Sequence, residues 1–532
     1  MGVKRLFLVL ILLFSSLLIY KLYFVKINNI RNIETKLQLN INHHKNNFSV
    51  FEKNSIDVKT DVVYLKINLM GGEIQTAELL KYQNKLNFLK KLKLLYTKNN
   101  NNYCIKSGFI AYGKKKLIYE KNIQYTADRI RFELINGNKM LFVPLISKIK
   151  DGVYCTKTFI LQQGSYKINI EYKIHNYNYK KFSFFLVNYL KQIIYPIKTI
   201  INFHRYYIKN GFDNIFISKE HQKYKKFLLN DVINNNTFSF VSYSGWLSVS
   251  QKYFSVGWIL NKNIQNTIYT ATVNDNHTVI VGHHTSTLNV FHKQIRRINT
   301  VLWMGPKIQH EMLSFAPYFD FTIDYGWFWF ISKPLLFFLH FLYLIFRNWG
   351  IAIILITCII RMLSYPLVKS QYISAMIIQS LQPEINALKK KYKDDKQKSS
   401  EKVLELYKKN NVSPFSGLLP TLFQMPIFLS LYYMLINSIE LRQSPFLFWI
   451  HDLSVKDPYY ILPIIMGITI FVMQKMTPSS IQSRLIRNKM IDYLPIVLSF
   501  CFLWLPAGLV LYYTVSNIVI IIQQLYIYNK FK

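Results

Sequence analysis

Hydrophobic residues are arranged in two different ways along this chain of 532 residues. Between residues 26 and 320 they mostly alternate with polar residues over short stretches, most regularly at 166–174 and again at 63–69. A period of two places the apolar side chains on one face of a β-strand and the polar ones on the other. Because many such stretches occur with few helical patterns, we predict a large all-β sandwich over residues 26–320.

Uninterrupted apolar runs fill much of the remaining sequence and resemble bilayer spans. The first follows Lys4 and Arg5, and no small-residue cleavage site is visible after it. We therefore predict an uncleaved membrane anchor over residues 1–25 rather than a signal peptide. Five more runs lie at 349–368, 418–438, 459–474, 491–505 and 509–528. The pattern predicts an α-helical membrane protein with six transmembrane spans, of which five form a core at 349–528.

The apolar run 327–346 could also cross a membrane, but its Lys333, Pro334 and His340 suit a helix lying in the interface. Charge decides between these alternatives. The loop 369–417 carries ten lysines against five acidic residues, and 477–490 carries three basic residues and no acidic one. The positive-inside rule places both loops and the N-terminus in the cytoplasm. Six spans satisfy this rule and seven do not, so we predict an interfacial helix within 321–348 and a β domain outside the membrane.

The net charge of +39 would by itself suggest a nucleic-acid partner. The lysines are spread widely among Asn, Ile and Tyr, and no nucleic-acid-binding module is recognisable. We therefore expect no sequence-specific binding of nucleic acid. Cys104 and Cys155 fall in the predicted external domain, where a disulfide could persist, but nothing in the sequence indicates that they meet. Because no Cys-x-x-Cys or His-Glu-x-x-His motif occurs, we expect no metal and no other cofactor.

Arg361 is the most informative single residue. It lies inside the predicted span 349–368, about seven residues from the cytoplasmic end, or roughly 10 Å deep at 1.5 Å per residue. An arginine within a span costs about 2.5 kcal/mol or more, so we expect its side chain to face protein or water rather than lipid. The alternative is that the long side chain reaches back to the headgroups.

Polar residues from the other predicted spans fall at a depth similar to that of Arg361. Thr357 and Ser364 share its helical face, and Gln424 lies at the matching position of the next span. Further polar residues in the same half of later spans are Thr469, Ser499, Gln523 and Gln524. One Ser or Thr alone is more often a contact between helices than a site. Together with Arg361, however, these residues predict a wet cavity open to the cytoplasm, and the apolar outer halves argue against a pore or a carrier.

The lysine-rich loop 369–417 shows apolar stripes that predict a helical hairpin. The stripes consist of Ile373, Ile377, Leu381, Ile385 and Leu388, followed by Val403, Leu404 and Tyr407. Its charged surface is either simply solvated or a binding surface for acidic headgroups, a ribosome or a translocon.

A series of short motifs runs in order through residues 302–528. It comprises Leu302-Trp303-Met304-Gly305-Pro306, Asp324-Tyr325-Gly326-Trp327, Asn348-Trp349-Gly350, Arg361 with Tyr365-Pro366-Leu367, Leu381-Gln382-Pro383, Asp394-Asp395-Lys396-Gln397, Gln424-Met425-Pro426-Ile427-Phe428, Trp449-Ile450-His451-Asp452-Leu453, Asp457-Pro458-Tyr459-Tyr460 and Gly508-Leu509-Val510-Leu511-Tyr512-Tyr513. This series resembles the YidC/Oxa/Alb family of membrane protein insertases. Thr60-Asp61-Val62, Gly71-Gly72 and Thr156-Lys157-Thr158-Phe159 are similar, more weakly, to the periplasmic domain of its Gram-negative type.

The resemblance implies an insertase and folding chaperone of the bacterial inner membrane, with both termini in the cytoplasm and a periplasmic β-supersandwich like that of sugar mutarotases. Its partners would be nascent membrane proteins, membrane lipids and the Sec translocon, with the ribosome and the signal recognition particle receptor as further candidates. Arg361 would lie in a hydrophilic groove that receives the polar end of a substrate. Phe428, Met466 and Tyr512 would line a hydrophobic slide toward lipid. Only a short tail at 529–532 follows the last span, so the resemblance does not extend to ribosome docking through a basic tail.

Two other classes of function are alternatives to insertion. An anchored periplasmic carbohydrate enzyme would need paired acid and base groups, and the densest candidates, His283-His284 and His310-Glu311, have no recognisable partners in the sequence. A solute transporter would need polar lining on both sides of the membrane, which the outer halves of the spans lack. We therefore expect no catalytic residues and no enzymatic activity.

Overall fold

The fold is described from a computed structural model of the chain. It covers residues 54–531 except 84–90, 99–100, 114–116, 136, 194–213, 221, 230–231, 233–236, 263, 274–277, 393–394, 411–418 and 477–493. The predicted anchor at 1–25 and the basic loop at 477–490 lie outside these residues.

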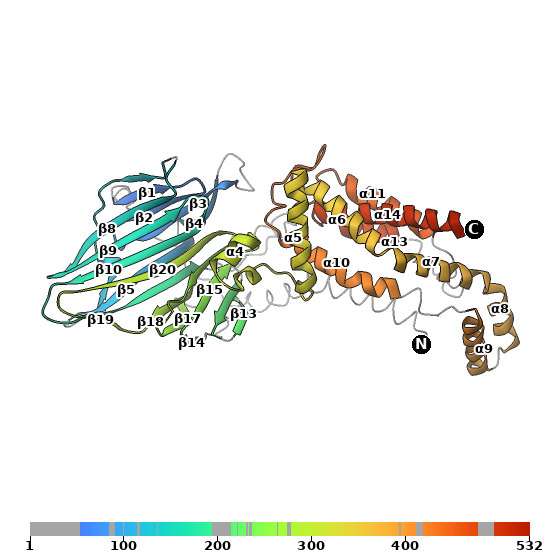
Figure 1. Cartoon of the computed structure of the whole chain (residues 1–532), viewed down its shortest axis with the longest axis horizontal. Coiled ribbons are helices and arrows are strands. Elements are labelled where there is room, and N and C mark those ends of the chain that lie inside the picture. Colours follow the sequence, from blue (N-terminus) through green and yellow to red (C-terminus); the bar gives the residue numbers. More distant parts are fainter. Residues whose placement is uncertain are drawn as a thin grey trace, which may run out of the picture. The chain divides into compact units, whose positions relative to one another are not determined.

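Two large sheets make up the β domain (Figure 1). In order across the sheet, the twelve-stranded one contains β14 (Ser239–Ser242), β17 (Asn266–Val273), β18 (Thr278–Thr285), β11 (Phe182–Ile193), β5 (Asn101–Tyr112), β4 (Lys91–Lys98), β3 (Glu73–Gln83), β2 (Val63–Asn68), β1 (Ser55–Lys59) and β7 (Arg131–Glu133), with β19 (Leu288–Val290) and β6 (Leu117–Tyr119) paired to β11 and β5. The eight-stranded sheet contains β13 (Gln222–Leu228), β12 (Asn214–Lys219), β15 (Gly245–Ser250), β16 (Phe254–Ile259), β20 (Gln294–Pro306), β10 (Lys167–Asn176), β9 (Val153–Gln162) and β8 (Met140–Lys150).

Strand β10 shows how the alternating pattern produces this architecture. Ile168, Ile170, Tyr172 and Ile174 are buried, whereas the residues between them are partly exposed. The strand pairs antiparallel with β9 on one side and β20 on the other, so a shift of one residue would turn its whole apolar face outward. The prediction of sandwich-like β sheets is confirmed. Strand β1 pairs antiparallel with β2 but parallel with β7.

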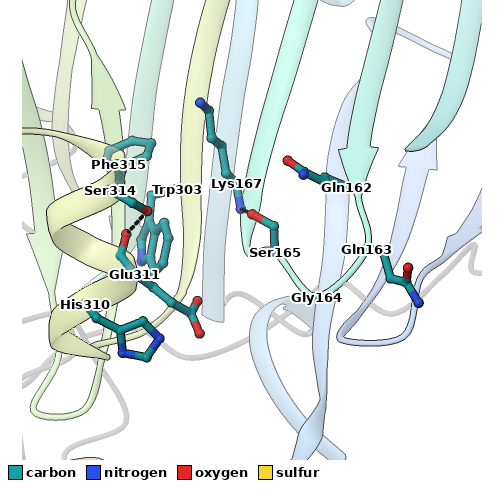
Figure 2. Close-up of a pocket in the computed structure, with 10 residues that line it drawn as sticks. All are labelled: Gln162, Gln163, Gly164, Ser165, Lys167, Trp303, His310, Glu311, Ser314 and Phe315. Atoms are coloured by element: carbon teal, nitrogen blue, oxygen red, sulfur yellow. Dashed lines mark hydrogen bonds between the residues drawn. The ribbon is translucent and has the colours of Figure 1, made fainter. Parts of the chain in front are cut away.

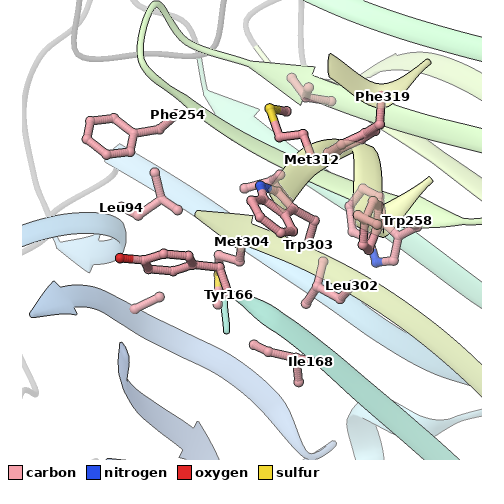
Figure 3. Close-up of a cluster of buried hydrophobic side chains, with 14 of the residues drawn as sticks. Leu94, Tyr166, Ile168, Phe254, Trp258, Leu302, Trp303, Met304, Met312 and Phe319 are labelled. Carbon is pink, nitrogen blue, oxygen red and sulfur yellow. The ribbon is translucent and has the colours of Figure 1, made fainter. Parts of the chain in front are cut away.

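Large aromatic side chains fill the core of the β domain beneath a short helix (Figure 3). Trp258 and Trp303 are almost completely buried, and Met304 lies next to Trp303 on β20. Helix α4 (Gln309–Phe315) follows β20 and contributes Met312, while Phe319 of the 3-10 helix η3 (Phe319–Thr322) packs with its ring centroid 6.1 Å from that of Trp303. Burial of side chains of this size contributes about 1.5–3 kcal/mol each.

The C-terminal part of the chain is helical. Its elements are α5 (Trp329–Phe346), α6 (Trp349–Leu363), α7 (Tyr365–Ser380), α8 (Gln382–Lys391), α9 (Lys396–Lys409), α10 (Leu419–Asn437), α11 (Ile461–Met476), α13 (Leu494–Phe502) and α14 (Ala507–Phe531). Within the described residues, α5 and α14 are each long and apolar enough to cross a membrane, and the pair α6 and α7 would make a third crossing if it is one span. In Figure 1, α5 runs across the direction shared by α6, α10 and α14.

The predicted continuous span 349–368 is interrupted in the structure. Helix α6 ends at Leu363, α7 begins at Tyr365, and the two are bent by 57°. Pro366 explains the break, because it has no backbone N–H and its ring clashes with the preceding turn of a continuous helix.

The lysine-rich segment contains the two helices α8 and α9. Asp395 begins α9 by accepting hydrogen bonds from the backbone N–H groups of Gln397 and Lys398, as a good N-cap residue does. The lysines Lys389, Lys390 and Lys391 end α8, where positive charge is favourable next to the helix dipole.

Candidate functional site

Arg361 is held by neutral oxygen atoms from two other helices. Its side chain, in the last turn of α6, is only 8% exposed. The Nε atom donates a hydrogen bond of 2.7 Å to Ser516 Oγ on α14, and Nη2 donates to the same oxygen. On α10, Gln424 Oε1 accepts a hydrogen bond of 3.1 Å from Nη1. The guanidinium therefore ties α6 to both α10 and α14.

Helix α14 provides a polar stripe around this arginine. Gln424 Nε2 donates to the Tyr512 hydroxyl at 3.4 Å, and Gln523 Nε2 donates to the backbone oxygen of Arg361 at 3.0 Å. Tyr512, Ser516 and Gln523 are separated by four and seven residues, so they lie along one face of α14. Helix α14 thus contacts both the side chain and the backbone of Arg361, and also the side-chain amide of its partner Gln424.

The positive charge of Arg361 has no anionic partner among the described residues. Each ion pair that a carboxylate forms within the described residues involves a cation other than Arg361. A guanidinium has five N–H donors, and hydroxyl and amide oxygens satisfy them without neutralising the charge. The site can therefore hydrogen-bond water or a carboxylate and attracts negative charge.

Two residues predicted for this site make other contacts. The Thr357 hydroxyl donates to Ile353 O at 2.6 Å, and the Ser364 hydroxyl donates to Ile360 O at 2.8 Å. Such bonds to the preceding turn satisfy a hydroxyl within its own helix. Thr357 is fully buried and Ser364 is partly buried, and neither is among the hydrogen-bond partners of the Arg361 side chain.

The apolar residues expected to form a slide occupy different environments. Phe428 is partly buried, with its ring centroid 4.9 Å from that of Tyr513. Met466 is completely buried and Tyr512 nearly so, hence neither side chain presents an open surface in this structure.

Sequence reasoning missed Ser516 and Asn517, although it placed Thr469 at a similar depth. Asn517 Nδ2 donates to Thr469 Oγ1 at 3.2 Å, which joins α14 to α11. A serine among apolar residues of a span is usually a packing contact, so its type alone gave no signal. Its spacing of four residues from Tyr512 was the available signal.

The pairs considered for carbohydrate chemistry do not form an acid–base site in the described structure. His283 is completely buried, and its Nε2 lies 3.2 Å from Asn188 Nδ2. His310 and Glu311 line a cavity of about 350 Å³ at the end of β20 (Figure 2). The other lining residues are Gln162, Gln163, Gly164, Ser165, Lys167, Trp303, Ser314 and Phe315. In this cavity the Ser314 hydroxyl donates a hydrogen bond of 2.6 Å to the backbone oxygen of Glu311 and not to its carboxylate.

The cysteines of the β domain are free thiols. Cys104 lies on β5 of the twelve-stranded sheet and Cys155 on β9 of the eight-stranded sheet. The buried Cys155 contacts the Tyr125 hydroxyl at 3.7 Å, and burial raises the pKa of its thiol to about 12.

Families and relatives of known proteins match nearly the whole chain. The family model for the 60Kd inner membrane protein matches residues 341–532, and the model for the YidC periplasmic domain matches residues 55–338. The membrane protein insertase YidC of Buchnera aphidicola subsp. Baizongia pistaciae is 40% identical over 530 residues, which cover 98% of each chain. Its counterpart from Buchnera aphidicola subsp. Schizaphis graminum is 40% identical over 537 residues, covering 100% of this chain and 99% of the relative. A crystal structure of an active YidC insertase with its first transmembrane domain resolved matches with a TM-score of 0.35 and 19% identity, over 89% of this chain and 92% of that one.

Proposed function

This chain belongs to the YidC family of membrane protein insertases, and from that premise we propose that Arg361, Gln424, Tyr512 and their neighbours form its hydrophilic groove. The protein inserts membrane proteins and is not an enzyme; it resides in the inner membrane and has a periplasmic domain. Its substrates are nascent membrane proteins, which it delivers to the surrounding lipid. The main support for this groove is that Arg361 is buried and that its side chain donates hydrogen bonds only to neutral oxygens.

The groove acts by lowering the cost of moving a polar segment into the membrane. Transfer of a peptide group from water to an apolar medium costs roughly 4–8 kcal/mol when nothing replaces its hydrogen bonds. Hydroxyl, amide and guanidinium groups supply such replacements, and the unneutralised charge of Arg361 favours acidic segments over basic ones. Thr357 and Ser364 add hydroxyl oxygens on the same face of α6.

A substrate that leaves the groove for the surrounding lipid contacts the apolar residues of the site. Phe428 and Met466 offer surface to the hydrophobic part of a substrate, and Tyr512 lies at the boundary because its ring is packed while its hydroxyl contacts Gln424. Since Met466 and Tyr512 are buried, this use of them requires α10, α11 and α14 to separate as the substrate leaves.

The topology that fits this function has six spans. An anchor occupies 1–25, the periplasmic domain 26–320, an interfacial helix 321–348 and the five-span core 349–528, with the cytoplasmic hairpin at 369–417 and the tail at 529–532. The lysine-rich loops support placement of both termini in the cytoplasm. The direction of α5 across its neighbours supports an interfacial position.

The helices α8 and α9 are the surface proposed for cytoplasmic partners. Lys389, Lys390 and Lys391 are exposed at the end of α8. The acidic surfaces that would match them belong to ribosomal RNA, the signal recognition particle receptor or anionic lipid, and the Sec translocon is the proposed partner within the membrane.

Photocrosslinking within α6 tests the groove directly. Ser364 shares the face of Arg361, whereas Met362 is 69% exposed on another face of the helix. A photoreactive residue at position 364 should crosslink to the polar segment of an arrested substrate. The same probe at position 362 is the control and should crosslink to lipid or to the apolar segment. Equal crosslinking of the polar segment from both positions would contradict a groove on the Arg361 face.

A further inference from the structure

The contact between Ser516 and Arg361 differs from the ordinary behaviour of hydroxyls in apolar helices. Thr514, two residues earlier on α14, donates to Val510 O at 2.8 Å and so satisfies itself within its own helix. Ser516 also contacts the Tyr512 hydroxyl on its own helix, but unlike Thr514 it accepts two hydrogen bonds from another helix, through Nε and Nη2 of Arg361. Ser516 is only 1% exposed, so water does not readily replace it.

These bonds define which part of the guanidinium stays available. Ser516 occupies the edge formed by Nε and Nη2, and Gln424 occupies one N–H of Nη1. Of the five N–H groups of an arginine, one on each terminal nitrogen therefore has no assigned protein acceptor among the described residues. A planar guanidinium fixed along one edge presents its other N–H groups in a defined direction.

We propose that Ser516 is a positioning residue that fixes the Arg361 guanidinium by one edge, so that its remaining N–H groups serve the incoming polar segment. This inference rests on the proposed function of the groove. Without the Ser516 oxygen, Arg361 keeps its charge but loses two of its three side-chain hydrogen bonds. A mobile arginine can turn toward the headgroups, as long cationic side chains in membranes do. Loss of Ser516 should therefore resemble partial loss of Arg361.

The inference is tested with three replacements of Ser516 in the full-length protein. Ser516→Ala removes the acceptor, Ser516→Cys keeps a similar shape with a weak acceptor, and Ser516→Thr keeps the hydroxyl. The matched control is Thr514→Ala, because Thr514 is also buried on the same helix but its hydroxyl donates only within that helix. Insertion is measured in cells for two substrates that differ only by Asp or Asn in the translocated segment, with the level of each variant checked.

We expect Ser516→Ala and Ser516→Cys to lower insertion of the acidic substrate about tenfold and that of the neutral substrate much less. Ser516→Thr and Thr514→Ala should stay within about twofold of the parent protein for both substrates. Adding Ser516→Ala to Arg361→Ala should cause no further loss, because the residue acts through the arginine. A merely structural role predicts equal defects for both substrates and an additional loss in the double variant, and either result overturns the inference.

The same experiment separates this inference from the groove proposal. If Arg361→Ala discriminates between the two substrates but Ser516→Ala and Ser516→Cys do not, only the role of Ser516 is overturned. If Arg361→Ala itself affects both substrates equally, the electrostatic role of the groove fails, and the inference about Ser516 fails with it. If Ser516→Ala does not accumulate, the comparison of Ser516→Cys with Ser516→Thr decides between the outcomes.

Discussion

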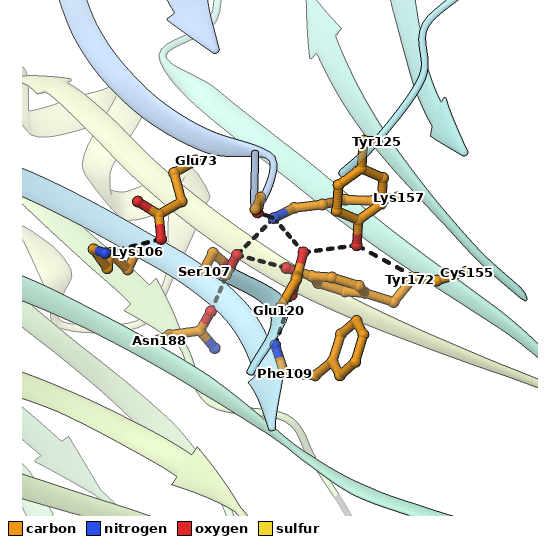
Figure 4. A network of polar contacts seen from close by, with 11 residues as sticks. Glu73, Lys106, Ser107, Phe109, Glu120, Tyr125, Cys155, Lys157, Tyr172 and Asn188 are labelled. Carbon is orange, nitrogen blue, oxygen red and sulfur yellow. Dashed lines mark hydrogen bonds and ion pairs between the residues drawn. The ribbon is translucent and has the colours of Figure 1, made fainter. Parts of the chain in front are cut away.

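Lys157 Nζ lies 2.9 Å from Glu120 Oε1 in the interior of the β domain, and both side chains are almost completely buried (Figure 4). The ammonium also donates to Ser107 O at 2.7 Å. Glu120 accepts further hydrogen bonds from the Tyr125 hydroxyl at 2.8 Å and the Phe109 backbone N–H at 2.7 Å. The charges are therefore paired and hydrogen-bonded, which offsets the high cost of removing them from water.

Removal of one member of this pair should destabilise the β domain strongly. Lys157→Met leaves the Glu120 carboxylate buried without its cation, and we expect a loss of about 3–5 kcal/mol in the free energy of unfolding. Combining it with Glu120→Gln should restore part of this loss. The measurement is urea-induced unfolding of the detergent-purified protein, followed by tryptophan fluorescence.

A surface pair on the same sheet provides the control for Lys157. Lys173 Nζ lies 3.5 Å from Glu171 Oε2, and both side chains are partly exposed to solvent. Lys173→Met should change the unfolding free energy by less than about 1 kcal/mol. Similar losses for both lysines would show that burial does not govern the effect.

His283 predicts how the stability of the β domain depends on pH. Burial lowers the pKa of its imidazole to about 3, with a smaller effect from His284, whereas the unfolded chain has a value near 6.5. Above about pH 6.5 both states are neutral and the stability contributed by this histidine is fully present. As the pH falls from 6.5 toward 3, the unfolded state binds the proton first, and stability declines by about 1.4 kcal/mol per pH unit.

Replacement of His283 should flatten this acid dependence. In His283→Gln the unfolding free energy is expected to change less between pH 6.5 and 4.5 than in the parent, by about 2–3 kcal/mol. Urea midpoints measured at these two pH values give the comparison. His284→Gln is the control, since His284 is only partly buried, and it should leave most of the slope in place. An unchanged slope in His283→Gln would show that other groups control acid stability.

Thiol labelling tests the proposed topology. In a background without the four native cysteines, Asn386→Cys on the exposed face of α8 should stay unlabelled by an impermeant reagent in intact cells. Asn138→Cys, in the turn before β8, should react once the outer membrane is made permeable. Both positions should react after the cells are lysed. Labelling at position 386 in intact cells would exclude a cytoplasmic hairpin and with it the six-span arrangement.

The sequence pattern predicted local features better than contacts between distant elements. Alternation identified β10 because it records burial on one face, whereas nothing local indicates that β1 and β7 run parallel. Composition located the apolar helices, but the run 349–368 concealed the break at Ser364. Pro366 was visible there, yet membrane helices often tolerate proline without a sharp bend.

In the candidate site, too, the sequence predicted single residues better than the contacts between helices. An arginine within an apolar run is costly, so Arg361 was conspicuous, and matching depth indicated Gln424 as a neighbour. Hydrogen bonds depend on how helices are rotated about their axes, which spacing within one helix does not define. Ser516 was therefore missed, while Thr357 and Ser364, on the correct face, bond instead to their own helix.

If the positive charge of Arg361 receives the polar segment of a substrate, variants that keep or remove this charge should affect acidic and neutral substrates differently. Insertion of the paired Asp and Asn substrates is measured with Arg361→Lys, which keeps the charge but not the planar fork, and with Arg361→Ala, at equal protein levels. We predict that Arg361→Lys retains more insertion of the acidic substrate than Arg361→Ala, and that the neutral substrate depends less on either change. Equal defects for both substrates in Arg361→Ala would contradict the claim and leave Arg361 as a residue that only joins α6 to α10 and α14.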